Sequence, residues 1–320
     1  MKNRPSINNS TILVTGGAGF IGSHLVDRLI KEGAKAVIVV DNMFLGNEDN
    51  LKDAFSHDII LYKDDIEITS SLDYIFETHN IDIVFNCATK ALNYSFVNPK
   101  NAFDTNVNGI LNILEHQRKG NFQTLVHFST SEVYGTAIYE PMDEEHPIKP
   151  TTTYAAGKAA ADIALHSWVN MYDLDAFIVR PFNNYGPRQN HKGYMAGIIP
   201  ITAYRILNGI SPEVHGTGLQ SRDFIYVLDT VDAIIKLYPK MKKAESVNIS
   251  TEGQVSMQEL VANIVNIMGY TGKVLNKPAR GADVECHHAS NEKVKSMIDY
   301  QLTPFNIGLG KTIQWYKENI

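Results

Sequence analysis

Two side chains that can move a proton lie four residues apart, at Tyr154 and Lys158. On a helix, residues at this spacing share one face, so the phenol and the ammonium would lie side by side. A neighbouring positive charge favours the phenolate and lowers the pKa of a tyrosine toward the range of a general base. The pair therefore predicts a proton-abstracting site, although a solvated surface pair has the same spacing.

A polar run follows an apolar segment at residues 124–128 that is typical of a buried strand. This run contains Thr130, Ser131 and Glu132. Ligands in open α/β sheets bind beyond the carboxyl ends of the strands, so we expect the run to line a site. Glu132 would bring a carboxylate there, and a purely structural hydrogen bond is the alternative interpretation.

A glycine-rich turn occupies residues 15–22, with glycines at Gly16, Gly19 and Gly22. A pyrophosphate needs backbone N–H groups at a helix N-terminus and no side chain in the way. The first glycine permits a tight turn, the second lets the phosphates approach, and the third lets helix and strand pack closely. Asp41 follows the next apolar run, where an acid accepts ribose hydroxyls and repels a 2′-phosphate. The turn therefore predicts a dinucleotide site that favours NAD over NADP.

Strands and helices alternate over the first part of the chain. Short apolar runs predict strands at 12–14, 36–40, 59–62, 81–86, 124–128 and 176–179. Helical periodicity predicts helices at 21–31, 71–79, 101–119 and 153–172. The pattern indicates an α/β fold of Rossmann type, a doubly wound parallel sheet covered on both faces.

The regular alternation stops after Arg180, where Gly and Pro become frequent. Further strands are predicted at 224–227 and 247–249, and we expect both to return to the sheet. Residues 1–182 are thus predicted to form the NAD-binding domain, to which 223–250 return. Residues 183–222 and 251–320 are predicted to form a smaller, interleaved C-terminal domain that binds the substrate.

The composition excludes several classes of protein. The 320 residues include 44% hydrophobic and 20% charged residues, with a net charge of −6, which argues against nonspecific nucleic-acid binding. Two cysteines make no disulfide framework, and no segment resembles a secretion signal or a membrane span, so we expect a cytoplasmic protein. Cys286-His287-His288 is a poor chelating set because adjacent side chains diverge, and no metal site is expected.

Taken together, these motifs resemble the extended short-chain dehydrogenase/reductase family, in its nucleotide-sugar epimerase/dehydratase branch. The resemblance spans essentially the whole chain and rests on the glycine turn, residues 129–135, 154–158, 180–188 and 221–227. It implies an NAD cofactor, a nucleotide-diphosphate sugar substrate, and a homodimer whose four-helix interface uses helices 101–119 and 153–172. The implied cofactor contacts are Gly16, Gly19, Phe20, Ile21, Gly22, Asp41, Asn42, Asp65, Ile66, Cys87, Ala88, Thr89, Asn106, Tyr154, Lys158 and Pro181.

The resemblance also implies roles in catalysis. Tyr154 would take the proton of the sugar hydroxyl at carbon 4 while hydride passes to NAD, and Lys158 would hold the nicotinamide ribose. Thr130 would hydrogen-bond the oxygen on carbon 4. The implied substrate contacts, mainly to the diphosphate, are Lys90, Asn183, Arg188, Arg222 and Arg280.

The reaction that follows depends on Glu132. In 4-epimerases of the family this position is usually small, whereas a carboxylate here can remove the proton of carbon 5 and allow water to leave. Re-reduction at carbon 6 then completes a 4,6-dehydratase cycle, which suits the synthesis of a surface polysaccharide. A UDP-, GDP- or dTDP-hexose is the expected substrate, with N-acetylglucosamine among the candidate sugars.

One departure from the family pattern keeps other reactions open. Ser131 stands where glucose-type dehydratases have Asp, and the same Ser–Glu pair occurs both in GDP-mannose dehydratases and in UDP-glucuronate decarboxylases. Lys90 could supply the cation that decarboxylation needs, so decarboxylation and 4-epimerisation remain alternatives. A non-catalytic NAD-binding scaffold is a different class, against which the intact Tyr154 and Lys158 argue.

Overall fold

The structure is a computed structural model that describes residues 4–279 and 286–320. Its central element is a seven-stranded sheet in the order β11-β6-β5-β4-β1-β2-β3, and every neighbouring pair is parallel. The strands are β1 Thr11–Thr15, β2 Ala36–Val40, β3 Ile59–Tyr62, β4 Ile83–Asn86, β5 Thr124–Phe128, β6 Asp175–Pro181 and β11 Ser246–Ile249. The strand order reverses between β1 and β4, which is where open α/β sheets bind ligands.

Helices cover both faces of the sheet because its strands are apolar on both sides. Along β1, Ile12 and Val14 pack into one core and Leu13 into the other, as the alternation of side chains in a strand requires. The first core lies under α1 Phe20–Lys31 and α6 Val227–Leu237, and the second under α2 Thr69–Thr78, α3 Pro99–Arg118 and α4 Thr153–Tyr172. The predicted doubly wound α/β fold is confirmed, and each helix predicted in residues 1–180 lies within two residues of its expected bounds.

Helix α4 is fixed at both ends and held close to α3. The hydroxyl of Thr152 accepts a hydrogen bond from the backbone N–H of Ala155, and the helix ends at Asp173 in the left-handed conformation. Gly157 faces α3, where an added Cβ would lie 2.9 Å from the carbonyl oxygen of Phe103. This close packing sets the position of the Tyr154–Lys158 face over the sheet.

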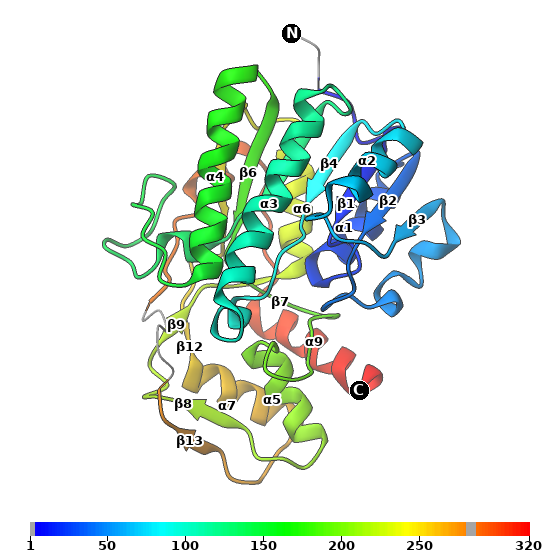
Figure 1. The fold of residues 1–320 in the computed structure, drawn as a ribbon. Coiled ribbons are helices and arrows are strands. Elements are labelled where there is room, and N and C mark those ends of the chain that lie inside the picture. The colour runs from blue at the N-terminus through cyan, green and yellow to red at the C-terminus, as the bar shows by residue number, and fades with distance from the viewer. Residues whose placement is uncertain (1–3, 280–285) are drawn as a thin grey trace.

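A smaller region lies beyond the carboxyl ends of the strands, in the lower part of Figure 1. It contains three two-stranded sheets, β7 Asn183–Tyr185 with β10 Phe224–Tyr226, β9 Ser221–Arg222 with β12 Val255–Ser256, and β8 Glu213–His215 with β13 Leu275–Lys277. Its core lies between α5 Ile198–Leu207, α7 Met257–Met268 and α9 Phe305–Asn319. The remaining elements are α8 Glu292–Met297, which packs against β11, and the short 3-10 helices η1 Glu48–Leu51, η2 Ala54–Ser56, η3 Leu92–Phe96 and η4 Ser131–Tyr134.

One predicted strand pairs elsewhere. Residues 224–227 were expected in the central sheet, but β10 pairs in parallel with β7 instead, and that expectation is wrong. The place beside β6 is taken by β11, in which Val247 pairs with Val179. A short apolar run indicates a strand without indicating its partner, so only the later of the two returning strands was placed correctly.

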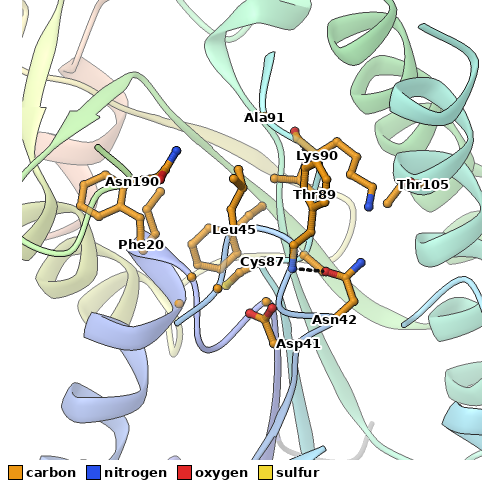
Figure 2. A pocket seen from close by; sticks show the side chains of 18 of the residues that line it. Phe20, Asp41, Asn42, Leu45, Cys87, Thr89, Lys90, Ala91, Thr105 and Asn190 are labelled. Carbon is orange, nitrogen blue, oxygen red and sulfur yellow. Dashed lines mark hydrogen bonds between the residues drawn. The ribbon is translucent and has the colours of Figure 1, made fainter. Parts of the chain in front are cut away.

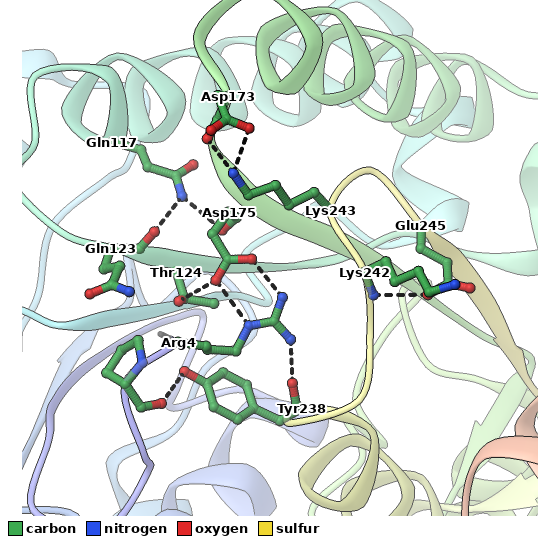
Figure 3. Close-up of polar contacts among 11 residues, drawn as sticks. Arg4, Gln117, Gln123, Thr124, Asp173, Asp175, Tyr238, Lys242, Lys243 and Glu245 are labelled. Atoms are coloured by element: carbon green, nitrogen blue, oxygen red, sulfur yellow. Dashed lines mark hydrogen bonds and ion pairs between the residues drawn. The ribbon is translucent and has the colours of Figure 1, made fainter. Parts of the chain in front are cut away.

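The amino ends of the central strands are tied to the start of the chain, as Figure 3 shows. The guanidinium of Arg4 donates two hydrogen bonds to Asp175, at 2.9 and 2.6 Å, and Thr124 donates a third to the same carboxylate at 2.7 Å. The hydroxyl of Tyr238 donates to the carbonyl oxygen of Pro5 at 2.8 Å. This cluster secures the edge of the sheet opposite the site. Among the described residues, no helix has both the length and the apolar character needed to cross a bilayer.

Candidate active site

A cavity of about 370 Å³ lies along the carboxyl ends of the strands, at the point where their order reverses. Figure 2 shows Phe20 and Asn190 on one side of it and Lys90 and Thr105 on the other. Most of the predicted cofactor residues line this cavity. They are Gly16, Gly19, Phe20, Ile21, Gly22, Asp41, Asn42, Asp65, Ile66, Cys87, Ala88, Thr89, Tyr154, Lys158 and Pro181.

The glycine turn has the shape that a pyrophosphate requires. Gly16 has a positive φ of 66°, and a Cβ there would lie 2.8 Å from the backbone of Ala88. A Cβ on Gly22 would lie 2.2 Å from the carbonyl oxygen of Gly16. Gly19 is the N-cap of α1 and offers no side-chain cap, so the first N–H groups of this helix remain for a ligand.

Asp41 supports the turn as well as lining the cavity. Its carboxylate accepts hydrogen bonds from the backbone N–H groups of Ala18 at 3.0 Å and Met43 at 2.9 Å. Burial raises the pKa of Asp41, and these hydrogen bonds oppose the shift. Asn42 donates to Asp65 at 2.7 Å, which brings two further predicted residues together. The acidic wall is unsuited to a 2′-phosphate and fits NAD.

Tyr154 and Lys158 lie on the cavity side of α4, but their ionisation differs from the sequence-based expectation. The ammonium of Lys158 donates to the carbonyl oxygen of Phe128 at 2.7 Å, and burial lowers its pKa to about 8. Burial raises the pKa of Tyr154 to about 12, while hydrogen bonds with Thr130 and Thr89 oppose the shift and the charge of Glu132 adds to it. In the protein alone, the expected lowering of the pKa of Tyr154 by Lys158 is therefore wrong.

A buried polar network beneath Lys158 was not predicted from the sequence. Asp162 accepts hydrogen bonds from the guanidinium of Arg180, at 3.2 and 3.1 Å, and from the hydroxyl of Ser129 at 2.8 Å. Arg180 also donates to the hydroxyl of Tyr134 at 2.9 Å. Asp162 follows Lys158 by one helical turn, and this spacing was the available signal.

Glu132 is buried at the start of η4, close to the catalytic face. Its backbone N–H donates to the hydroxyl of Thr130 at 3.2 Å. Its charge acts on Tyr154, and its Oε1 lies 3.8 Å from Nδ1 of His287. His287 is a poor metal ligand by its sequence context, yet the fold brings it close to the carboxylate of Glu132. Ser131 is buried beside Glu132, and neither residue is part of the lining of the cavity, which ends at Thr130 on this segment.

Lys90 forms part of the cavity wall rather than an exposed surface. Its side chain is buried, and its ammonium lies 4.4 Å from the ring centre of Phe44 and 5.8 Å from that of Tyr94. A cation over an aromatic face is stabilised without a carboxylate. Lys90 therefore presents a positive charge next to the cofactor cavity.

A second cavity, of about 750 Å³, continues into the smaller region. It shares Asn184, Gln189 and Gly197 with the first cavity, so the two adjoin. Asn183 and Arg222 line it. The amide nitrogen of Asn183 is buried and has no hydrogen-bond partner among the described residues, so a ligand oxygen could accept from it.

The other predicted contacts are placed differently. Arg188 lines neither cavity, and its guanidinium forms an ion pair with Asp27 of α1 at 2.7 Å. Asn106 also lies outside the cavity linings. It accepts a hydrogen bond from Thr89 at 2.7 Å and donates one to the carbonyl oxygen of Tyr154 at 3.3 Å, so it positions both residues.

Arg280, another predicted substrate contact, lies outside the described residues. Within the described residues, no three His, Cys, Asp or Glu side chains are grouped to hold a metal.

The parallel sheet, the glycine turn at its switch point and the Tyr–Lys pair define a dinucleotide-dependent enzyme of the short-chain dehydrogenase type. The chain belongs to the NAD dependent epimerase/dehydratase family, whose model matches residues 12–250. It is 35% identical over 312 residues to a putative UDP-glucose 4-epimerase of Methanocaldococcus jannaschii, covering 96% of this chain and 99% of the relative.

Solved structures of the family are similar over nearly the whole chain. The UDP-glucose 4-epimerase of Thermotoga maritima, solved with UDP-glucose, has a TM-score of 0.91 and 32% identity, covering 97% of this chain and 99% of that one. The dTDP-glucose 4,6-dehydratase of Bacillus anthracis, solved with NAD, has a TM-score of 0.87 and 30% identity, covering 97% of each chain. NAD is therefore the cofactor, and both epimerases and dehydratases are relatives.

Proposed function

We propose that this enzyme is a nucleotide-sugar 4,6-dehydratase. The observation that carries the proposal is the buried carboxylate of Glu132, whose charge acts on Tyr154. From the protein, oxidation at carbon 4 by NAD needs only Tyr154, Lys158 and a hydroxyl partner such as Thr130. A second base beside them is what removal of the carbon 5 proton requires, because a neighbouring ketone makes that proton acidic.

Each residue then has a defined task in the reaction. Tyr154 takes the proton of the carbon 4 hydroxyl, and Thr130 holds the oxygen. Asp41 and Lys158 would hold NAD, which would supply hydride transfer at carbons 4 and 6 and a positive ring that favours the phenolate of Tyr154. Glu132 takes the carbon 5 proton and passes it to the carbon 6 hydroxyl, which leaves as water. Hydride then adds to carbon 6, and carbon 5 takes a proton from solvent.

The second cavity is the proposed place of the nucleotide diphosphate. Asn183 offers a buried amide donor, and Arg222 lines the same wall with a planar, charged donor group. We propose a UDP-, GDP- or dTDP-hexose, including N-acetylglucosamine, as the substrate. Arg188 is left out of the proposed contacts because its ion pair with Asp27 already holds it.

Two related reactions are alternatives. A 4-epimerase is favoured by the names of the relatives from Methanocaldococcus jannaschii and Thermotoga maritima, and it would need no carboxylate at residue 132. A decarboxylase would need a cation for the substrate carboxylate, which Lys90 on the cavity wall could supply. The reactions differ in the mass of the product. Incubation with a panel of UDP-, GDP- and dTDP-sugars should give loss of one water, whereas loss of carbon dioxide or an isomer of unchanged mass would refute the proposal.

We further propose a cytoplasmic homodimer that serves the synthesis of a surface polysaccharide. Apolar side chains on the outer faces of α3 and α4 support the dimer, namely Phe103, Ile163, Met171 and Tyr172, which are exposed in the single chain. Two such helices from each of two chains would form a four-helix interface that covers these side chains.

A further inference from the structure

His287 reaches the catalytic face from a segment far along the chain. Two backbone hydrogen bonds anchor this segment, one from His287 to Ser221 at 3.3 Å and one from Met142 to His288 at 2.8 Å. The ring of His287 is fully buried, and its Nδ1 lies 3.8 Å from Oε1 of Glu132. The smaller region thus contributes a side chain to a carboxylate of the Rossmann domain.

The hydrogen bonding of the ring fixes its tautomer. Nε2 lies 3.0 Å from the carbonyl oxygen of Gly135, an acceptor, so Nε2 must carry the proton. Nδ1 therefore holds a lone pair, and it is a buried nitrogen without a hydrogen-bond partner among the described residues. A buried acceptor of this kind calls for a donor, and a protonated carboxyl group at Glu132 is a donor that the reaction itself would supply.

Burial, together with the nearby positive charge of Arg222, keeps the ring of His287 neutral. The groups that face it are Arg222 on β9, His146 in the loop before α4, and Glu132. Burial, and after it the charge of Arg222, lowers the pKa of His287 to about 3. The ring of His287 is therefore neutral near pH 7, and Nδ1 keeps its lone pair there.

We propose that His287 is a positioning residue for Glu132, whose Nδ1 accepts a hydrogen bond from the carboxyl group once it has taken a proton. This inference rests on the proposed dehydratase. When the carbon 5–hydrogen bond breaks, its electron pair enters the enolate of the 4-ketone and the proton forms an O–H bond on Glu132. A lone pair facing that O–H stabilises the protonated carboxyl, while it gives the carboxylate nothing. His287 therefore favours proton removal at carbon 5 and has no part in oxidation at carbon 4.

Two variants distinguish the role of Nδ1 as an acceptor from the role of Nε2 as a donor. His287→Asn places an amide oxygen near the position of Nδ1 and so keeps an acceptor for Glu132. His287→Gln places an amide N–H near the position of Nε2 and so keeps the donor to Gly135, without the acceptor. A merely structural role would make the glutamine variant the milder one, because it preserves the hydrogen bond observed in the structure.

The test follows exchange of the carbon 5 hydrogen in D₂O, together with absorbance of reduced NAD in a single turnover. We expect His287→Gln to slow the exchange about tenfold, the effect of one lost hydrogen bond, with carbon 4 oxidation nearly unchanged. His287→Asn should restore most of the exchange. Equal losses in both variants, or no loss in His287→Gln, would overturn the inference. A wild-type enzyme that forms no dehydrated product would instead overturn the proposed function.

A second measurement needs no substitution. Nitrogen-15 NMR of the histidine rings distinguishes the two neutral tautomers. We expect the ring of His287 to carry its proton on Nε2 between pH 6 and 8, and a proton on Nδ1 in that range would contradict the inference even if both variants failed to fold.

Discussion

The ammonium of Lys158 donates a hydrogen bond to the carbonyl oxygen of Phe128, 2.7 Å away at the end of β5. This contact joins the catalytic face of α4 to the carboxyl edge of the sheet. The ammonium of Lys158 is buried there, and burial lowers its pKa to about 8. The geometry of the site and the stability of the fold are therefore linked through one side chain.

This link predicts a dependence of stability on pH. Between the lowered pKa of about 8 and the ordinary value of 10.5, the unfolded chain binds a proton that the folded protein lacks. The free energy of unfolding should therefore rise with pH above 8, by at most about 1.4 kcal/mol per pH unit. The rise should end near pH 10, where Tyr154 begins to lose its proton in the unfolded chain only.

Urea unfolding at pH 7.5, 8.5 and 9.5 measures this effect. Lys158→Met should remove most of the rise, whereas Lys236→Met, which removes a partly exposed ammonium paired with Asp232, should keep it. An identical slope in the wild type and in Lys158→Met would show that the buried ammonium does not titrate in this range.

The glycine turn predicts a difference between two alanine substitutions. A Cβ on Gly22 would lie 2.2 Å from the carbonyl oxygen of Gly16, so Gly22→Ala should distort the turn and destabilise the fold. A Cβ on Gly19 meets only that same oxygen, at 3.1 Å, and otherwise enters the cavity. Gly19→Ala should therefore fold and bind NAD at least about tenfold more weakly, a loss of about 1.4 kcal/mol.

Calorimetric titration with NAD and thermal unfolding check both variants. Gly310→Ala is the matched control, because a Cβ there meets no atom within 4 Å and the residue lies in α9, away from the turn. Wild-type NAD affinity in Gly19→Ala would mean that the phosphates do not approach this residue.

The network beneath Lys158 predicts a large effect of a small change. Asp162→Asn leaves the guanidinium of Arg180 buried without its counter-charge, and we expect a loss of about 3 kcal/mol in the free energy of unfolding. Asp173→Asn removes an exposed ion pair with Lys243 and should cost less than about 1 kcal/mol. If chemical unfolding gave similar losses of unfolding free energy for the two variants, Asp162 would not be the counter-charge that stabilises buried Arg180.

The proposed dimer is tested on the outer face of α4. Ile163 and Met171 are 62% and 67% exposed in the single chain, so charged residues there should leave the chain's own fold intact. Light scattering should find the wild type as a dimer and Ile163→Asp/Met171→Glu as a monomer of equal helical content. A dimer that persists in the double variant would place the interface elsewhere.

The sequence predicted the Rossmann part of the molecule well for a physical reason. Its strands are buried on both faces and its helices on one, so apolar runs and helical periodicity mark them directly, as in α4 at Thr153–Tyr172. The glycine turn could also be predicted from the sequence, because its backbone shape requires glycine at particular positions such as Gly16 and Gly22. The first cavity brings together most of the predicted residues that follow β1, β2, β4 and β5, whereas Ser131 and Glu132 lie outside its lining.

What the sequence could not predict depends on contacts between distant segments. The partner of β10 was misassigned because a three-residue run does not specify its neighbour. The ionisation of Tyr154 was misjudged because burial outweighs the charge that spacing suggested. His287 near Glu132 was not foreseen, since the two lie in different regions of the fold and share no motif.

The proposal that this enzyme is a 4,6-dehydratase dependent on Glu132 is tested most directly by following the hydride from carbon 4. A nucleotide hexose with deuterium on carbon 4 is incubated with the wild type and with Glu132→Gln, and the products are examined by mass spectrometry and NMR. The proposed dehydratase predicts a product lighter by one water, with the deuterium moved to carbon 6. It also predicts that Glu132→Gln binds NAD normally and loses no water from the substrate. Deuterium that remains on carbon 4 of an isomer of unchanged mass, or water loss at the wild-type rate in Glu132→Gln, would contradict the claim.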